Sequence, residues 1–141
     1  MSYALIRKQL ELALNALSAG FDTAYENAPY TPKVGTAYQR VNLLPGQTEN
    51  PTMGDGFKRE VGIFQIMLAF PPKAGPAAAL ARAEVLRVGM KRGTTYNDTN
   101  VRVLINQAPY ISPALQDDVW YMLPVSVPFI ADVFEIGRAH V

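Results

Sequence analysis

Two long segments alternate between apolar and other residues, and they restrict the chain to folds with an extended sheet. Phe57–Phe70 places Phe64, Ile66 and Leu68 on one face, and Val119–Val133 repeats the alternation. A period of two residues indicates β-strands. Fully extended, the fourteen residues of the first segment would span about 45 Å, more than a typical strand. We therefore predict that part of the hairpin formed by Tyr38–Leu44 and Phe57–Phe70 projects beyond the body of the domain.

Two shorter strands, Tyr38–Leu44 and Asn100–Asn106, and two helices complete the predicted elements. Ser2–Ala19 has an apolar face at helical spacing, and a second helix is predicted from Pro76 to a stop at Gly93. The order helix, strand, strand, helix, strand, strand predicts an α+β domain. Its sheet is expected to be mainly antiparallel and four-stranded, with both helices on one face.

Prolines mark the last predicted strand. Pro124 and Pro128 both lack an N–H group for pairing. They predict an edge position or a bulged strand for Val119–Val133, and not a central one.

Single-domain length is consistent with one core: the chain has 141 residues, of which 49% are hydrophobic. We expect residues 1–134 to form the domain. The last seven residues, "EIGRAHV", follow a completed strand and can be encoded by a common sequencing adapter read in frame. We expect residues 135–141 to be non-native.

Reactive chemistry finds little support in the residue types present. The chain has no cysteine and a single histidine, His140 in the suspect tail, so we expect no metal, cofactor or catalytic residue. Asp117-Asp118 is the best carboxylate pair, but neighbours on a strand point apart, and we interpret the pair as capping or solubilising a loop. The net charge of +1 does not indicate nucleic-acid binding. No apolar run is long enough for a membrane helix.

The second predicted helix carries two features that suggest association. One apolar stripe is Ala79, Ala83, Leu86 and Met90, and a second, smaller one is Ala81, Val85 and Val88. Two stripes predict contact with more than one partner surface. The helix and its end also carry four basic residues: Arg82, Arg87, Lys91 and Arg92. These form either a solvated face that complements the helix dipole, or a patch that faces a polyanion or an acidic neighbour.

The connection between the first two strands is unusually long. "LPGQTENPTMGDGFKREVGIF" joins them through polar residues marked by glycine and proline. A long loop in a compact domain is usually functional or disordered. We refer to Pro45–Lys58 as the arm.

Several segments in sequence order resemble the phage tail terminator-like family, which includes the minor tail protein U type. They are "NAPYTP", "GTAYQRVNLLPG", a long loop into "GIFQI", then "GPAAALARAEVLRVGMKRGTTY" and "PYISPALQDDVWYMLPVSVPFIA". The resemblance covers about residues 1–131. It implies a non-enzymatic virion protein that forms a hexameric ring at the head-proximal end of a phage tail, after assembly in the host cytoplasm.

The resemblance also implies partners: copies of the chain itself, the major tail tube protein and the head–tail connector, with DNA as transiting cargo and no membrane. The ring would end tube polymerisation and provide the surface that docks to the head. We expect the arm to be mobile in an isolated subunit and to order against a neighbour or the tube. The arm residues assigned to this interface are Pro45, Gln47, Asn50, Met53, Asp55, Phe57 and Lys58.

Two alternatives stay open at this point. The chain could be another head–tail joining or tail-completion protein of the neck. It could also be a monomeric binding module for a small ligand, with Tyr25, Tyr30 and Trp120 as pocket walls. For the basic residues, the resemblance suggests either the channel through which DNA passes or acidic residues of an adjacent subunit.

Overall fold

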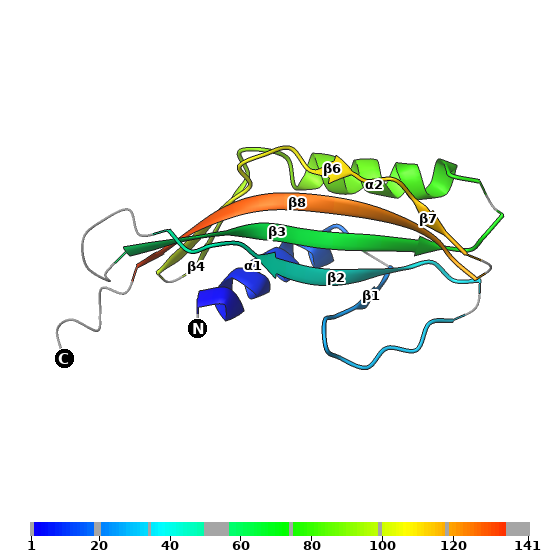
Figure 1. The fold of residues 1–141 in the computed structure, drawn as a ribbon, viewed down its shortest axis with the longest axis horizontal. Coiled ribbons are helices and arrows are strands. Elements are labelled where there is room, and N and C mark those ends of the chain that lie inside the picture. The colour runs from blue at the N-terminus through cyan, green and yellow to red at the C-terminus, as the bar shows by residue number, and fades with distance from the viewer. Residues whose placement is uncertain are drawn as a thin grey trace.

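Two helices and one sheet make up the part of the chain that the structure describes (Figure 1). The computed structural model describes residues 2–18, 21–33, 35–49, 57–73, 75–98, 100–117 and 119–134. The helices are α1 (Ser2–Ala16) and α2 (Ala77–Gly89). The strands are β1 (Asp22–Ala24), β2 (Tyr38–Pro45), β3 (Phe57–Phe70), β4 (Thr95–Asp98), β5 (Val101–Leu104), β6 (Tyr110–Ile111), β7 (Leu115–Gln116) and β8 (Tyr121–Phe134). The α+β class is as predicted.

The sheet is larger and more mixed than predicted. Its order is β1-β2-β3-β8-β5-β4, with β6 and β7 also paired to β8. All pairs are antiparallel except β1 with β2. The prediction of a four-stranded sheet is wrong. The extra strands have two to four residues each, too few to show an alternating pattern.

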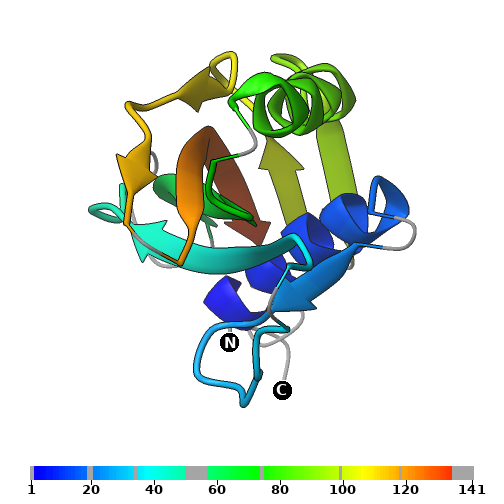
Figure 2. The ribbon, with the colours of Figure 1, turned by 90° about the vertical axis from the view of Figure 1, so that its right-hand side faces the viewer.

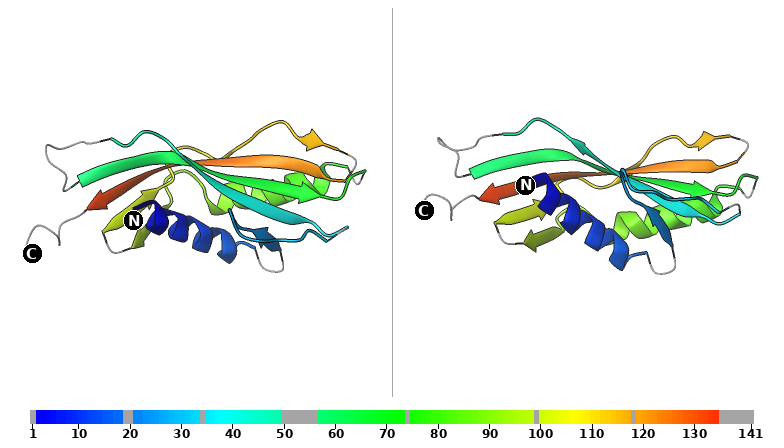
Figure 3. Two further views of the ribbon diagram at one scale, coloured as in Figure 1. Left: turned by 60° about the horizontal axis from the view of Figure 1, so that its bottom comes forward. Right: turned by 90° about the horizontal axis from the view of Figure 1, so that it is seen from below.

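β3 and β8 form the spine of the molecule. They pair without interruption from Phe57 opposite Phe134 to Phe70 opposite Tyr121. The predicted bounds of the first long strand are therefore confirmed. Near the start of α1, the ends of β3 and β8 extend past the helix (Figure 3). The hairpin predicted to project joins Tyr38–Leu44 to Phe57–Phe70, whereas this extension is formed by β3 and β8, and the ladder between β2 and β3 stops at Pro45 opposite Gly62.

β8 lies in the middle of the sheet, so the edge position inferred from its prolines is wrong. Its other side pairs with three separate short strands: β7 at residues 121–122, β6 at 125–126 and β5 at 130–133. Phe134 donates its backbone N–H to the carbonyl of Asn100 on that side. Backbone N–H groups point to alternate sides along a strand, and Pro124 and Pro128 are an even number of residues from Phe134. Their nitrogen atoms therefore point to the same side. Their missing N–H groups therefore fall in the gaps between the short strands, while pairing with β3 stays intact.

Both helices contribute to one buried cluster on the same side of the sheet (Figure 3). From α1 it contains Ile6, Leu10 and Leu14. From α2 and its end it contains the predicted stripe of Ala79, Ala83, Leu86 and Met90. The sheet curls around this core (Figure 2) and adds the inward residues of β2, β3, β5 and β8. α2 ends at Gly89, with Met90 as its C-cap, and not at the predicted Gly93. The predicted stop of the first helix at Gly20 lies outside the described residues.

Candidate interaction surface

The structure describes only the two ends of the arm. Asn50, Met53 and Asp55 lie outside the described residues. Pro45 and Gln47 are exposed, Lys58 is half-buried, and Phe57 is placed by its backbone at the start of β3.

The described ends of the arm continue the ladder between β2 and β3. Gly46 donates its N–H to the carbonyl of Val61 at 2.7 Å, and Glu49 exchanges two backbone hydrogen bonds with Arg59. The Thr48 hydroxyl bonds the carboxylate of Glu60. Hydrogen bonds therefore hold these ends against the sheet, and the mobility of the arm stays a prediction.

An ion pair joins β3 to β8 near the place where the arm enters β3. Arg59 Nε donates to Asp132 Oδ1 at 2.9 Å, and the two residues are direct cross-strand partners. The hydrogen bond and the charge of Asp132 raise the pKa of Arg59 further. Opposite charges facing each other across a strand pair stabilise the pairing modestly.

Arg82 is turned into the subunit. Its guanidinium donates to the carbonyl of Leu17 at 2.6 Å, to Ser18 Oγ at 2.7 Å and to Gln39 Oε1 at 3.1 Å. It also lies 4.7 Å from the ring centre of Phe21. Partial burial lowers the pKa of Arg82. Its N–H groups fasten α2 to the end of α1 and to β2, so we leave Arg82 out of the charge proposals below.

Arg87, Lys91 and Arg92 remain at the surface. Arg87 donates through Nε to the carbonyl of Pro109 at 2.9 Å and through Nη1 to Glu84 at 3.0 Å. Lys91 and Arg92 are exposed and form no ion pair with any residue in the described ranges. Of the four predicted basic residues, these two are the most available to a partner.

The second apolar stripe of α2 has no partner within the described subunit. The exposed fraction is 47% for Val85 and 70% for Val88. Together with Leu17, Ala81, Glu84 and Gly89, these residues line a shallow, mostly apolar groove, which we call the α2 groove. An added Cβ at Gly89 would lie 2.4 Å from the side chain of Leu17, so the glycine leaves room for Leu17, which follows α1. The sequence prediction of a second stripe is thus matched by an uncovered apolar surface.

Truncating a side chain should affect the free energy of unfolding very differently in the two apolar stripes of α2. Leu86→Ala should destabilise the subunit by about 3 kcal/mol, because it leaves a cavity in the core. Val88→Ala should change the free energy of unfolding by less than about 0.5 kcal/mol, because the side chain is mostly in water. Urea unfolding at a concentration that keeps the chain monomeric measures both. Equal costs would mean that the assignment of buried and exposed faces is wrong.

A second exposed apolar patch lies at the turn between β7 and β8. Leu115 is 59% exposed and Val119 is 55% exposed. Asp117 Oδ1 accepts the N–H groups of Val119 at 2.8 Å and Trp120 at 2.6 Å. These two bonds lower the pKa of Asp117, which favours its ionised form. We call Leu115, Asp117 and Val119 the β7 patch.

From the sequence, Asp117 and Asp118 were expected only to cap or solubilise the loop. Asp117 indeed holds the turn, and Asp118 lies outside the described residues. The exposure of Leu115 and Val119 was missed, because β7 is too short to show which of its residues face outward.

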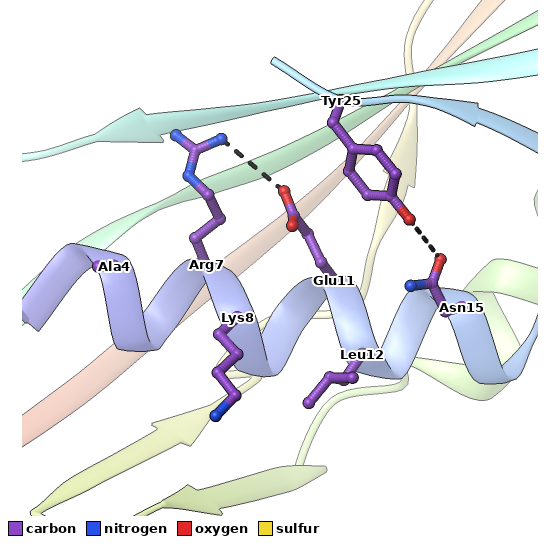
Figure 4. A pocket seen from close by; sticks show the side chains of 7 residues that line it. All are labelled: Ala4, Arg7, Lys8, Glu11, Leu12, Asn15 and Tyr25. Carbon is purple, nitrogen blue, oxygen red and sulfur yellow. Dashed lines mark hydrogen bonds and ion pairs between the residues drawn. The ribbon is translucent and has the colours of Figure 1, made fainter. Parts of the chain in front are cut away.

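A shallow trough runs along the outer face of α1 (Figure 4). Arg7 and Glu11 form an ion pair at 3.8 Å, and the hydroxyl of Tyr25 donates to Asn15 at 2.9 Å. Arg7 also pairs with Glu26 at 2.9 Å. Burial raises the pKa of Glu11, against the opposing effect of Arg7. These groups satisfy one another, and the trough is a structural feature of the subunit.

Glu26 closes part of the open edge of β2. Its carboxylate accepts the N–H of Leu43 at 3.1 Å. That bond, followed by the bond from Arg7, lowers the pKa of Glu26 below its ordinary value of 4.5. A carboxyl with a depressed pKa stabilises the fold above its unfolded-state pKa, and this stabilisation is lost as the pH falls through the folded-state pKa.

We therefore expect the melting temperature of the wild type to fall more steeply than that of Glu26→Gln below about pH 4.5. The two curves are compared by circular dichroism between neutral pH and the acid limb. Glu84→Gln, at an exposed glutamate of α2, is the matched control. Parallel curves for wild type and Glu26→Gln would contradict the stabilising role of this carboxylate.

The three aromatic residues proposed as walls of a ligand pocket are not brought together. Tyr30 and Trp120 both pack on Tyr38: the ring centre of Tyr38 lies 5.0 Å from that of Tyr30 and 5.1 Å from that of Trp120. Tyr25 instead packs against the main core and bonds to α1. Among the described residues there is no group of three histidine, cysteine, aspartate or glutamate side chains able to hold a metal. No described helix is long and apolar enough to cross a membrane.

Comparison with known proteins places this fold. A solved structure known only by a sequence identifier has a TM-score of 0.75 and 23% identity, covering 94% of this chain and 96% of that chain. At this identity the likeness shows the fold alone. A search of curated proteins finds no match. Residues 3–129 match the phage tail terminator protein family, and the chain belongs to this family. It is accordingly a structural component of a phage tail.

Proposed function

We propose that the chain caps the phage tail tube as a ring of identical subunits, six in number. In this proposal the ring ends polymerisation of the major tail tube protein and provides the surface on which the head–tail connector docks. It lies at the head-proximal end of the tail, and DNA only passes through it. The proposal extends the membership of the phage tail terminator protein family.

The observation that carries the proposal is the uncovered apolar stripe of α2. Val85 is about half exposed and Val88 is mostly exposed, although Ala83 and Leu86 on the adjoining face of the helix are buried in the core. Contiguous exposed apolar surface on a soluble protein commonly marks an interaction site. A ring needs each subunit to present such surface to a neighbour, in a contact whose rotation closes.

The arm supplies the second proposed contact. Its described ends continue a β-ladder at the projecting end of β3. The arm thus leaves the subunit beside the start of β3, and we propose that it is available there to a neighbour or to the tube. We propose that Pro45, Gln47, Asn50, Met53, Asp55, Phe57 and Lys58 form this contact.

Size-exclusion chromatography with light scattering tests the ring. We expect a concentration-dependent species of six times the subunit mass, formed by the chain alone or on addition of tail tubes. Because the proposed contacts include apolar surface, part of the association should persist at high salt. A strict monomer at high concentration, both with and without tubes, would contradict the proposal.

A further inference from the structure

Two exposed apolar surfaces of the subunit lie on different elements. In Figure 2, β7 lies at the left of the long strands, and the two helices lie toward the right. The β7 patch and the α2 groove therefore belong to different sides of the subunit. A ring of identical subunits is built from heterologous contacts, each joining two different surfaces.

From this arrangement we infer that the β7 patch of one copy seats in the α2 groove of the next copy. The inference rests on the proposed function and names the subunit contact of the ring. Leu115 and Val119 would pack against Val85 and Val88, so each apolar surface would cover the other. Burial of apolar area is the main favourable contribution to such an association.

Charge complementarity supports a second copy as the occupant. Lys91 and Arg92 follow Gly89, the last groove residue of α2, by two and three positions and are exposed. The acidic residue that lines the groove, Glu84, is ion-paired with Arg87. The β7 patch presents an exposed carboxylate, Asp117, between its two apolar side chains. Opposite charges beside matched apolar surfaces fix the register of a contact and disfavour wrong partners.

The β7 patch is also held in one conformation before it binds. β7 pairs with β8 through Leu115 opposite Met122 and Gln116 opposite Tyr121. Asp117 and Trp120 close the turn through backbone and side-chain hydrogen bonds. The ring of Trp120 is anchored against Tyr38 in an edge-on contact. A preorganised surface loses little conformational entropy on association.

The absence of cysteine from the chain makes the contact testable by disulfide cross-linking. Two single variants, Val88→Cys and Leu115→Cys, carry different tags and are mixed in equal amounts under mild oxidation. A disulfide forms only when the two Cα atoms approach within about 7 Å. We expect a cross-linked heterodimer from the mixture, and little product from either variant alone. An intrachain bond is impossible because each chain has one cysteine.

The matched control pairs Val88→Cys with Leu44→Cys, since Leu44 is also exposed but lies on β2. Equal cross-linking of the control pair would overturn the inference. A homodimer of Val88→Cys alone would also overturn it, because that product indicates a symmetric contact between two α2 grooves. A charge test is independent: the double change Lys91→Glu and Arg92→Glu should weaken association about tenfold, whereas Lys8→Glu, at an exposed lysine of α1, should leave it unchanged. Equal association of both variants with the wild type would contradict the proposed charge pairing.

Failure of this subunit contact and failure of the proposed function give different results. If it associates and ends tails, but the Val88→Cys and Leu115→Cys mixture gives no heterodimer, this contact is wrong and the proposed function stands. If tails are complete without the chain, the proposed function fails whatever the cross-linking shows.

Discussion

Deletion of Gln47–Gly54 should abolish tail termination and leave a folded subunit. The core cluster contains no residue from the described part of this segment. The pairing of β3 with β8 from Val61 to Phe70 lies beyond the deleted segment and should remain. We therefore expect the far-ultraviolet circular dichroism spectrum of the purified subunit to be preserved, while complementation of a phage lacking the chain fails. Normal complementation by the deletion variant would mean that the arm is not needed for tail termination.

A second variant controls for the geometry of the deletion. Gly46 is bonded to Val61, four residues along β3 from Phe57. These four residues span about 13 Å in a strand. The two residues left after deletion reach about 11 Å, so the start of β3 must leave the sheet. Replacing Gln47–Gly54 by eight glycine and serine residues keeps the span. If side chains of the arm make the contact, this variant also fails to end tails.

Arg82→Leu should cost about 4 kcal/mol of the free energy of unfolding. It removes the cation that three acceptors share: the carbonyl of Leu17, Ser18 Oγ and Gln39 Oε1. Ser18 and Gln39 are buried, so the lost bonds are not replaced by water. Hydrogen bonds to a charged group contribute about 1.5–3 kcal/mol each, and unsatisfied buried partners add to the loss. The melting temperature should fall on the order of 10 °C.

Arg87→Leu is the matched control for Arg82→Leu. Arg87 occupies the same helix, but its ion-pair partner Glu84 is more than half exposed. Its replacement should cost no more than about 1 kcal/mol. Differential scanning calorimetry of both variants measures the contrast. Similar losses for the two variants would contradict the structural assignment of Arg82.

The fold could be predicted where the sequence pattern extends over many residues. β3 and the buried stripe of α2 follow from alternation and helical spacing that persist over several turns or pleats. β1, β6 and β7 could not be predicted, because two or three residues carry no period. The position of β8 was misjudged for a different reason. Proline forbids a hydrogen bond at one point, and the sheet accommodates it by interrupting the neighbouring strand.

The candidate site could be predicted only in part. The second apolar stripe of α2 was visible in the sequence, and its exposure makes it a surface for association. The basic residues could not be sorted by spacing alone. Arg82 is held inside by groups from α1 and β2, which are distant in sequence. Lys91 and Arg92 lie beyond the helix and stay exposed. Whether a basic residue is held inside or exposed depends here on packing between segments distant in sequence, which the local sequence pattern does not show.

Electron microscopy of particles assembled without this chain tests the central claim most directly. Because this polypeptide is proposed to stop growth of the tube, its removal should give tails of variable, excessive length that do not join heads. Supplying the wild-type chain should restore one length and a closed head-proximal end. Tails of uniform length, closed and joined to heads in its absence, would contradict the account.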